Sequence, residues 1–297
     1  MRKSTQLIVQ KPGLLTLIQD LGRAGNQAFG VPVGGAMDRQ SAALANTLVG
    51  NPLDAPVLEM TLLGPTFLLQ EAATIAFTGG TIEAFADGVP IAPNQMHQLP
   101  AESKLRFGRV LKGCRSYLAI QGDWQVQKWL GSGSWHSKTT TPDSWIRKGQ
   151  ILSISSSYPI EQSIPISLPE MDLNYPFRFL EGPEYQLLTP QQVQQLWDTE
   201  FTVDPVSNRM GYRLSPNLTM DQVFTPMISS AVLPGTVQLT PSGQLIVLMA
   251  DAQTTGGYPR IGVIHSEDLD RLGQVRPGGV LRIQPPKVLP LQRKDIL

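Results

Sequence analysis

Short apolar segments, separated by turns rich in glycine and proline, run through the whole chain and favour a fold built mainly from strands. Gly supplies 27 and Pro 25 of the 297 residues, well above their average share. In residues 57–63, Leu58 and Met60 alternate with Glu59 and Thr61, which is the period-two pattern of a strand. We therefore expect a mainly β protein with dense turns.

Two turns predict hairpins directly. The Lys-Pro-Gly sequence at residues 11–13 lies between the apolar segments 7–10 and 14–18. The Thr-Pro-Ser-Gly sequence at residues 240–243 links two further apolar segments in the same way.

Helices are few and short. Asp38 can cap a helix over residues 39–49, which a glycine follows. A Thr-Pro pair opens a second helix over residues 190–197, and Ser266 opens a third over residues 267–274.

The charge balance excludes several classes of partner. Lys and Arg number 24 and Asp and Glu number 24, so the formal net charge is zero. A nucleic-acid or anionic-membrane binder normally shows a basic excess, and neither partner is expected. The longest apolar run, residues 245–250, falls far short of the roughly 20 residues of a membrane span. The first ten residues lack the apolar core of a signal peptide, so we expect a cytoplasmic protein.

Cys114 is the only cysteine, so no disulfide can form within the chain. The three histidines are widely separated, and the usual spacing of a zinc site is absent from the sequence. No metal site is expected.

The middle of the chain predicts a linker. Residues 155–173 are rich in Ser, Pro and Ile. We expect an N-terminal β domain over residues 1–160 and a C-terminal β domain over residues 170–297.

Three stretches carry candidate site residues. The first contains Gln19, Asp20 and Arg23 and leads through glycines 34 and 35 towards the Asp38 helix. Unpaired backbone N–H groups at a helix start can meet an anion. A purely structural turn explains this stretch equally well.

The second stretch is the strand-like segment 209–214. In a strand, Arg209, Gly211 and Arg213 share one face, with the arginines about 13 Å apart. That arrangement suits carboxylate or phosphate groups. The alternative is a solvated strand face with ordinary ion pairs.

The third stretch follows the apolar run at 245–250 and is the strongest local candidate. Asp251 could serve as a general base, and the paired glycines could present N–H groups to an anion. Its candidate residues are Asp251, Gln253, Thr255, Gly256, Gly257 and Tyr258.

Known catalytic signatures are missing from the sequence. It contains no phosphate-binding loop, no Gly-x-Ser-x-Gly elbow and no Met-Lys pair of the kind that carries biotin. A biotin attachment site in this chain is therefore not expected.

Four sequence blocks are distinctive when taken in order. They are Gln-Asp-Leu-Gly-Arg at 19–23, Gly-Gly-Ala-Met-Asp at 34–38 and, most specific, Arg-Met-Gly-Tyr-Arg at 209–213 and Gln-Thr-Thr-Gly-Gly-Tyr-Pro at 253–259. Together they resemble the allophanate hydrolase subunit 2 family of carboxyltransferase domains, which includes the C component of 5-oxoprolinase, KipA and a segment of urea amidolyase. The resemblance runs from about residue 14 to residue 283.

The resemblance implies two cyclophilin-like β-barrel-type domains. It implies the activity of an ATP-dependent 5-oxoprolinase, which opens the 5-oxoproline lactam to L-glutamate with ATP and Mg as cofactors. It also implies two partners, a KipI-like subunit 1 (the B component) and a lactam-utilisation-type protein (the A component). The ATP site could lie on this chain or on a partner.

Within that activity, Asp251 or Asp20 could orient or deprotonate water. Arg209, Arg213 and the glycines at 256 and 257 could hold phosphate or substrate carboxylate. These roles are hypotheses from the chemistry of the residues.

One segment departs from the family pattern. Gly133 stands where members usually carry an arginine, in Gly-Ser-Gly-Ser at 131–134, and the segment that follows lacks the expected glycine pairs. Two other functions stay open: a component of a biotin-dependent urea or allophanate-type carboxyltransferase, and a non-catalytic regulator that binds a KipI-like partner. The departure at Gly133 supports the regulator.

Overall fold

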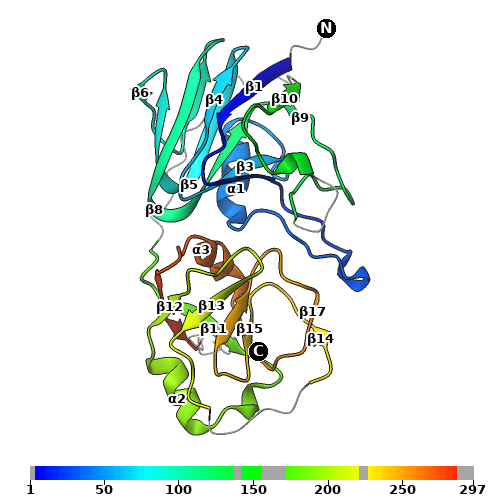
Figure 1. Cartoon of the computed structure of the whole chain (residues 1–297), viewed down its shortest axis with the longest axis vertical. Helices are drawn as coiled ribbons and strands as arrows, with labels where there is room; N and C mark the ends of the chain where they lie inside the picture. Colours follow the sequence, from blue (N-terminus) through cyan, green and yellow to red (C-terminus); the bar gives the residue numbers. More distant parts are fainter. Residues whose placement is uncertain (1–3, 137–141, 156–171, 221–226, 286–297) are drawn as a thin grey trace, which may run out of the picture.

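The computed structural model describes residues 4–136, 142–155, 172–220 and 227–285. The expectation of a mainly β protein is confirmed, because two large sheets contain most of the regular secondary structure of the described residues (Figure 1). The first sheet uses strands between residues 4 and 155, and the second uses strands between residues 177 and 284. Nearly all of the expected linker, residues 155–173, lies outside the described residues.

The first sheet is organised around one long strand, β8, which pairs with β3, β4 and β5. Its main path runs β2-β3-β8-β4-β1-β10-β9, and β5 carries β6 and β7 at its side. The strands are β1 (Ser4–Lys11), β2 (Leu15–Gln19), β3 (Val57–Thr61), β4 (Thr66–Leu69), β5 (Ala73–Ala86), β6 (Val89–Pro90), β7 (Met96–Leu99), β8 (Lys104–Ile120), β9 (Asp123–Trp124) and β10 (Ile151–Ser155).

The hairpin expected at residues 11–13 is wrong. β1 pairs with β4 and β10, whereas β2 pairs with β3. The Pro-Gly turn redirects the chain, and Leu14 N–H donates to the carbonyl of Leu63 over 2.9 Å. The turn therefore joins two strands that lie in different parts of the same sheet. The turn sequence alone does not determine which strands they pair with.

Helix α1 (Arg39–Leu48) packs on the face of this sheet formed by β3, β5 and β8. Its predicted cap is confirmed, because the Asp38 carboxylate accepts from Ser41 N–H over 2.9 Å. The helix ends one residue before the predicted boundary. Ala42, Ala45 and Leu48 supply its buried stripe.

The second sheet curls into a barrel-like form. Its order is β19-β12-β13-β16-β15-β18-β11-β20, and only Arg282 separates the strands at its two ends, β19 and β20. The predicted turn at 240–243 is confirmed as the hairpin between β15 and β16. The strands are β11 (Phe177–Glu181), β12 (Phe201–Val203), β13 (Gly211–Ser215), β15 (Thr236–Leu239), β16 (Leu245–Leu248), β18 (Arg260–Ile264), β19 (Val280–Leu281) and β20 (Ile283–Gln284), with β14 (Ser230–Ala231) and β17 (Thr255–Gly256) forming a separate two-stranded ladder.

The other predicted helices also form. Helix α2 (Pro190–Asp198) begins with the Thr189 capping box. The third segment starts as a 3₁₀ turn, η4 (Ser266–Asp268), and continues as α3 (Leu269–Gly273), so Ser266 lies inside the turn and His265 precedes it. Three further 3₁₀ turns are η1 (Gln27–Phe29), η2 (Pro142–Ser144) and η3 (Tyr185–Leu187).

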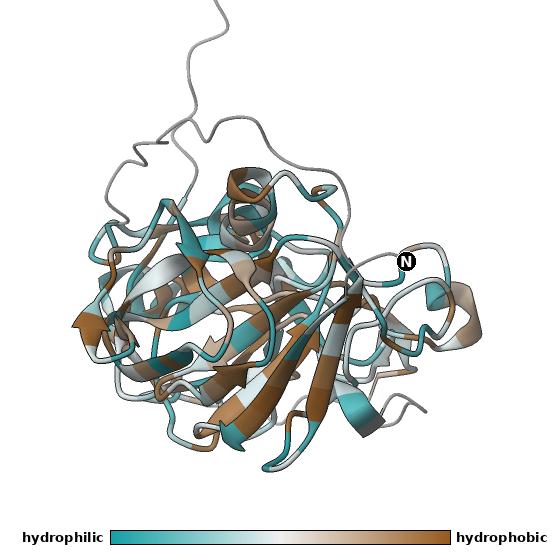
Figure 2. Cartoon of the chain, turned by 90° about the horizontal axis from the view of Figure 1, so that it is seen from above, coloured by the Kyte–Doolittle hydropathy of each residue, from teal (hydrophilic) through white to brown (hydrophobic). Residues whose placement is uncertain are grey.

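Each sheet encloses its own apolar core, and apolar residues follow the strands in Figure 2. The two sheets meet beside α1 and α3 (Figure 1). Gly273 of α3 packs so tightly there that a Cβ atom would lie 2.4 Å from the carbonyl oxygen of Met37. In the described residues, no helix has the length and apolarity needed to cross a membrane.

Candidate functional site

A buried guanidinium lies at the junction of the two sheets. Arg209 donates from Nε to Asp251 Oδ2 over 2.8 Å and from Nη2 to Asp251 Oδ1 over 3.0 Å. Its Nη1 donates to Glu59 of β3, and its Nη2 also reaches the carbonyl of Gly35. Arg209, Asp251 and Glu59 are all buried, with 5%, 3% and 0% of their surface exposed, respectively. One guanidinium therefore pairs with a carboxylate from each side of the junction.

The charges of the two carboxylates outweigh the effect of burial on Arg209. Burial by itself would lower the pKa of the guanidinium, whereas Asp251 and Glu59 raise it above its ordinary value. Arg209 therefore stays charged under all ordinary conditions.

A tight turn aims Arg209 inward. Asn208 Oδ1 accepts from Met210 N–H over 2.8 Å, so the chain reverses just before β13. The pairing of β13 with β16 then continues beyond both strands, because Asp251 N–H donates to the carbonyl of Arg209 over 2.9 Å. This backbone bond sets the Arg209 and Asp251 side chains beside each other.

The predicted face shared by Arg209, Gly211 and Arg213 is wrong. The strand begins at Gly211, so Arg209 belongs to the preceding turn and turns into the junction. Arg213 is exposed, and its Nη1 donates to Gln244 Oε1 over 2.9 Å. The two guanidiniums therefore occupy different environments and do not form a common anion site.

Arg115 of β8 adds a second link between the sheets. Its Nη1 donates to the Tyr212 hydroxyl of β13 over 2.8 Å and to the carbonyl of Gly273. Its Nε lies 3.6 Å from Glu59 Oε1. We call Arg115, Glu59, Arg209 and Asp251 the interface ion network.

Glu59 is fixed by neutral donors as well. Its Oε2 accepts from Met37 N–H over 2.8 Å and from the Tyr117 hydroxyl over 3.0 Å. Tyr117 in turn accepts from Asp38 N–H over 2.8 Å. Every oxygen of this buried carboxylate is thus engaged, as a charge in a dry environment requires.

Asp20 binds the loop at residues 132–134, which we call the Asp20 loop. Asp20 Oδ1 accepts from the hydroxyls of Ser132 and Ser134 over 2.7 and 2.6 Å. Its Oδ2 accepts from Gly133 N–H over 2.7 Å, and Oδ1 also accepts from Gly22 N–H. The carboxylate is saturated with donors, which is the arrangement of a positioning group.

Arg23 lies almost entirely inside the protein, next to the Asp20 loop. Its Nη2 contacts the carbonyl of Ser134, and its Cζ atom lies 5.2 Å from the centroid of the Trp129 ring. Within the described part of the chain, its Nε and Nη1 have no hydrogen-bond partner. Burial lowers the pKa of this guanidinium, and the charges of Asp20 and Asp251 oppose that shift.

His136 follows the Asp20 loop and is 5% exposed. Burial lowers the pKa of its imidazole, while the nearby charge of Asp251 raises it and that of Arg23 lowers it. Because the net shift is downward, the ring is neutral near pH 7 and can accept a proton.

The glycine-rich stretch after Asp251 lies apart from this cluster. Gln253, Thr255, Gly257 and Tyr258 are exposed, and β17 pairs with β14. Gly256 packs against Gln238, where a Cβ atom would lie 2.4 Å from Nε2. Gln19 is fully buried in the first sheet, and its Nε2 donates to the carbonyl of Trp135 over 3.4 Å.

The interface ion network forms part of the wall of a cavity of about 350 Å³ between the sheets, which we call the interface pocket. Arg115, Arg209 and Asp251 line it. Its other lining residues are apolar or polar without charge: Leu15, Thr61, Leu62, Cys114, Trp135, Ser207, Asn208, Met210, Tyr212 and Pro277. A pocket with apolar walls and a few fixed charges is the usual form of a small-molecule site.

Both lining guanidiniums already contact a carboxylate, so this pocket offers poor binding for a triphosphate. In the described residues, no group of three or more His, Cys, Asp or Glu side chains is arranged to hold a metal ion.

The candidate stretches of the sequence missed Glu59, Arg115 and His136. Glu59 and Arg115 lie within ordinary-looking strand segments, and His136 lies in a segment without a motif. Tyr212 lies inside the candidate stretch 209–214 but is not one of its candidate residues. The signal for Glu59 was its acidic side chain in an otherwise apolar strand. Its partners come from residues up to 150 positions away, so no local pattern marks them.

The sequence matches the family described as carboxyltransferase domain, subdomain A and B, over residues 29–285. The chain therefore belongs to this family. It is 34% identical to the C component of 5-oxoprolinase from Haemophilus influenzae over 271 residues, covering 90% of this chain and 87% of that protein. It is also 34% identical to the corresponding 5-oxoprolinase component of Escherichia coli, covering 92% and 88% of the two chains.

Solved structures of larger proteins share the fold. The protein TTHA0988 superposes with a TM-score of 0.84 at 30% identity, covering 96% of this chain and 56% of its own. The urea carboxylase of Kluyveromyces lactis superposes with a TM-score of 0.83 at 27% identity, covering 96% of this chain and 27% of its own.

Proposed function

We propose that this chain is the C component of an ATP-dependent 5-oxoprolinase, which opens the lactam of 5-oxoproline to L-glutamate. The observation that carries the proposal is its 34% identity to two proteins named as that component, along nearly the full length of both. The enzyme is a hydrolase of a cyclic amide, and the chain works within a cytoplasmic complex.

The interface pocket is the proposed substrate site. Its volume of about 350 Å³ suits a small ring, and the side chains of Leu15, Leu62 and Met210 can pack against the ring carbons. Asn208 and the hydroxyl of Ser207 line the same cavity and can bond to an amide.

Arg209 and Arg115 act as fixed charges in this proposal. Both are held by carboxylates and by the backbone, so they need no rearrangement when negative charge develops on the lactam oxygen. Asp251 is tied to Arg209 through both oxygens, so its role is to orient Arg209 and polar groups of the pocket. His136 is neutral and close to Asp251 and can take a proton, although it is not among the residues that line the interface pocket.

ATP and Mg²⁺ belong, in this proposal, to the complex rather than to the interface pocket. The lining guanidiniums are already engaged, so we place the nucleotide on a partner protein or at a shared surface. The partners are a KipI-like B component and a lactam-utilisation-type A component. ATP supplies activation of the lactam carbonyl there.

A second function is favoured by one observation, the match to the carboxyltransferase family and to urea carboxylase. Under it, the same pocket would receive a carboxylated biotin from a separate carrier chain and pass the carboxyl group to urea or a related amide. The third function, that of a regulator, draws only on the departure from the family pattern at Gly133.

The test is reconstitution of the complex from this chain and its two partners. We expect glutamate release that depends on both 5-oxoproline and ATP and that stops when this chain alone is omitted. Turnover that continues without the chain would refute the proposal, as would an assembled complex that hydrolyses no 5-oxoproline. Activity that instead needs a biotin carrier and urea would support the second function.

A further inference from the structure

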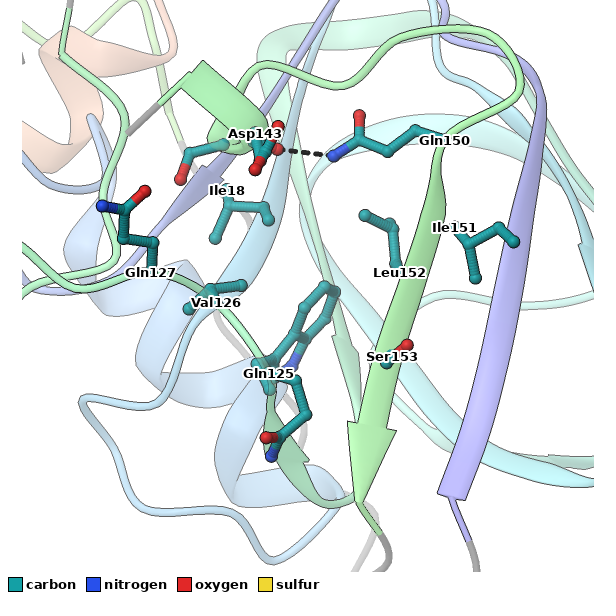
Figure 3. A pocket seen from close by; sticks show the side chains of 11 residues that line it. Ile18, Gln125, Val126, Gln127, Asp143, Gln150, Ile151, Leu152 and Ser153 are labelled. Atoms are coloured by element: carbon teal, nitrogen blue, oxygen red, sulfur yellow. Dashed lines mark hydrogen bonds between the residues drawn. The ribbon is translucent and has the colours of Figure 1, made fainter. Parts of the chain in front are cut away.

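A second cavity lies on the first sheet, away from the interface ion network. It measures about 310 Å³ and lies beside β9, β10 and η2. Figure 3 shows the apolar side chains of Ile18, Val126 and Leu152 in its middle. Polar side chains surround them, and we call this cavity the glutamine-rimmed pocket after Gln125, Gln127 and Gln150.

Among the described residues that line this pocket, Asp143 alone carries a charged side chain. Within the described residues, the Asp143 carboxylate has no ion-pair or hydrogen-bond partner, and only its backbone carbonyl is engaged, by Gln150 Nε2 over 2.6 Å. Asp143 is exposed and lines the rim of a cavity whose floor is apolar.

The remaining rim groups include open acceptors for a donor-rich ligand, and one donor, the Trp124 indole N–H, has no hydrogen-bond partner within the described residues. The hydrogen bonds of the Gln125 side chain use its Nε2 atom, which leaves its carbonyl oxygen open. Gln127 makes no side-chain hydrogen bond within the described residues and is exposed. Open carbonyl and carboxylate oxygens attract N–H donors, and a lone negative charge repels anions.

From this arrangement we propose that the glutamine-rimmed pocket is a binding site for a small organic cation, a primary ammonium carried on a branched apolar body. The ammonium lies against Asp143 and the rim amides, and the body packs on Ile18, Val126 and Leu152. Anionic molecules, including the nucleotide and the 5-oxoproline of the proposed function, are excluded from this pocket. The inference does not depend on that function.

The pocket shares a wall with the Asp20 loop. Ser144 lines the pocket and donates to the carbonyl of Gly133 over 2.7 Å, and Gly133 N–H donates to Asp20. Gly133 also faces Val126 of the pocket floor, where a Cβ atom would lie 2.8 Å from Cγ2. A ligand here would therefore touch side chains that hold the loop next to Arg23.

The test uses three probes that share one carbon skeleton and differ in charge: the cation isopentylamine, the neutral 3-methylbutan-1-ol and the anion isovalerate. Binding is followed by the indole N–H signal of Trp124, which lines the pocket. The chain has five tryptophans, and Trp124→Phe identifies the signal. We expect the amine to shift this signal at the lowest concentration, the alcohol to bind about fivefold more weakly, and the acid to bind weakest.

Asp143→Asn keeps the shape of the side chain and removes its charge, and the variant should reduce amine affinity about fivefold, to that of the alcohol. The matched control is Asp123→Asn, because Asp123 is exposed and is not among the residues that line the pocket. This variant should leave the order of the three probe affinities unchanged. If Asp143→Asn lowers the yield of folded protein, Gln127→Ala provides a second variant with the same expected direction.

The proposal is overturned if the three probes bind equally or if the acid binds best. It is also overturned if no probe shifts the Trp124 signal at concentrations well above those at which specific small ligands bind. It is also overturned if Asp143→Asn leaves the preference for the amine intact. None of these outcomes bears on 5-oxoproline turnover, so the two proposals fail separately.

Discussion

At the scale of single residues, the molecule depends on charges that are buried and fully paired. Arg209 serves two carboxylates and one carbonyl at the junction of the sheets. Removing one member of such a group leaves the others charged and without a partner in a dry environment, which costs more than the pair contributed.

Arg209→Met should therefore lower the free energy of unfolding by about 3–5 kcal/mol. The matched control is Arg213→Met, which removes an exposed guanidinium that bonds to the Gln244 side chain. It should change the free energy of unfolding by no more than about 0.5 kcal/mol. Urea unfolding at neutral pH measures both values. Equal losses in the two variants would contradict the structural assignment of these arginines.

Asp38 carries a pH dependence that the structure predicts. Burial raises the pKa of its carboxyl to about 6, although hydrogen bonds from Ser41 and Gln274 partly oppose the shift. The folded protein thus holds this proton more tightly than the unfolded chain does. Its contribution to stability is complete below about pH 4 and is lost as the pH rises through 6, and it amounts to about 3 kcal/mol.

Comparison with Asp38→Asn isolates this contribution. Between pH 4 and about pH 6, the free energy of unfolding of the wild type should fall relative to that of the variant. The pH dependence, rather than the absolute stability, is compared, because the variant also loses an acceptor for Gln274 Nε2 and this loss does not vary with pH. Parallel curves for the two proteins would rule out a raised pKa at Asp38.

At the scale of elements, one side chain ties the end of α3 to β8. Gln274 Oε1 accepts from the N–H groups of Cys114 and Arg115, and its Nε2 donates to Asp38 and to the carbonyl of Arg115. All four of its hydrogen-bonding positions are used, and it is fully buried. The amide acts as a short bridge between the two sheets.

Gln274→Leu should lower the free energy of unfolding by roughly 3 kcal/mol or more, because several buried groups lose their partner at once. Gln194→Leu on the exposed side of α2 is the control and should have little effect. Thermal unfolding of the two variants in parallel checks the difference, and a mild effect at position 274 would mean that water replaces the amide.

The elements also show which predictions the sequence supports. Caps act over three or four residues, so Asp38 and Thr189 located two helices to within a residue. Strand pairing is set by distant segments, and for that reason the turn at 11–13 did not predict its partners. Before β13, the hydrogen bond from Met210 N–H to the Asn208 side chain turns the backbone, so Arg209 points into the junction. The alternation of side chains along a strand could not predict this orientation.

At the scale of the whole molecule, the junction of the two sheets brings together residues that the sequence keeps far apart. Asp20 and Arg23 could be named as candidates from their glycine-rich context, and Asp251 from its place after an apolar strand. Their roles could not, because Asp20 is saturated by a loop more than 100 residues away and Asp251 by Arg209. Glu59 and His136 became visible only through the fold.

The interface pocket gives the most direct test of the account. Leu15→Trp enlarges a residue that lines the pocket, whereas Leu14→Trp enlarges its neighbour, which is 63% exposed and does not line it. Both variants are compared with the wild type for glutamate release from 5-oxoproline in the reconstituted complex. We predict that Leu15→Trp lowers kcat/KM by about tenfold or more while Leu14→Trp leaves it unchanged. Full activity of Leu15→Trp in an assembled complex would contradict the placement of 5-oxoproline between the two sheets.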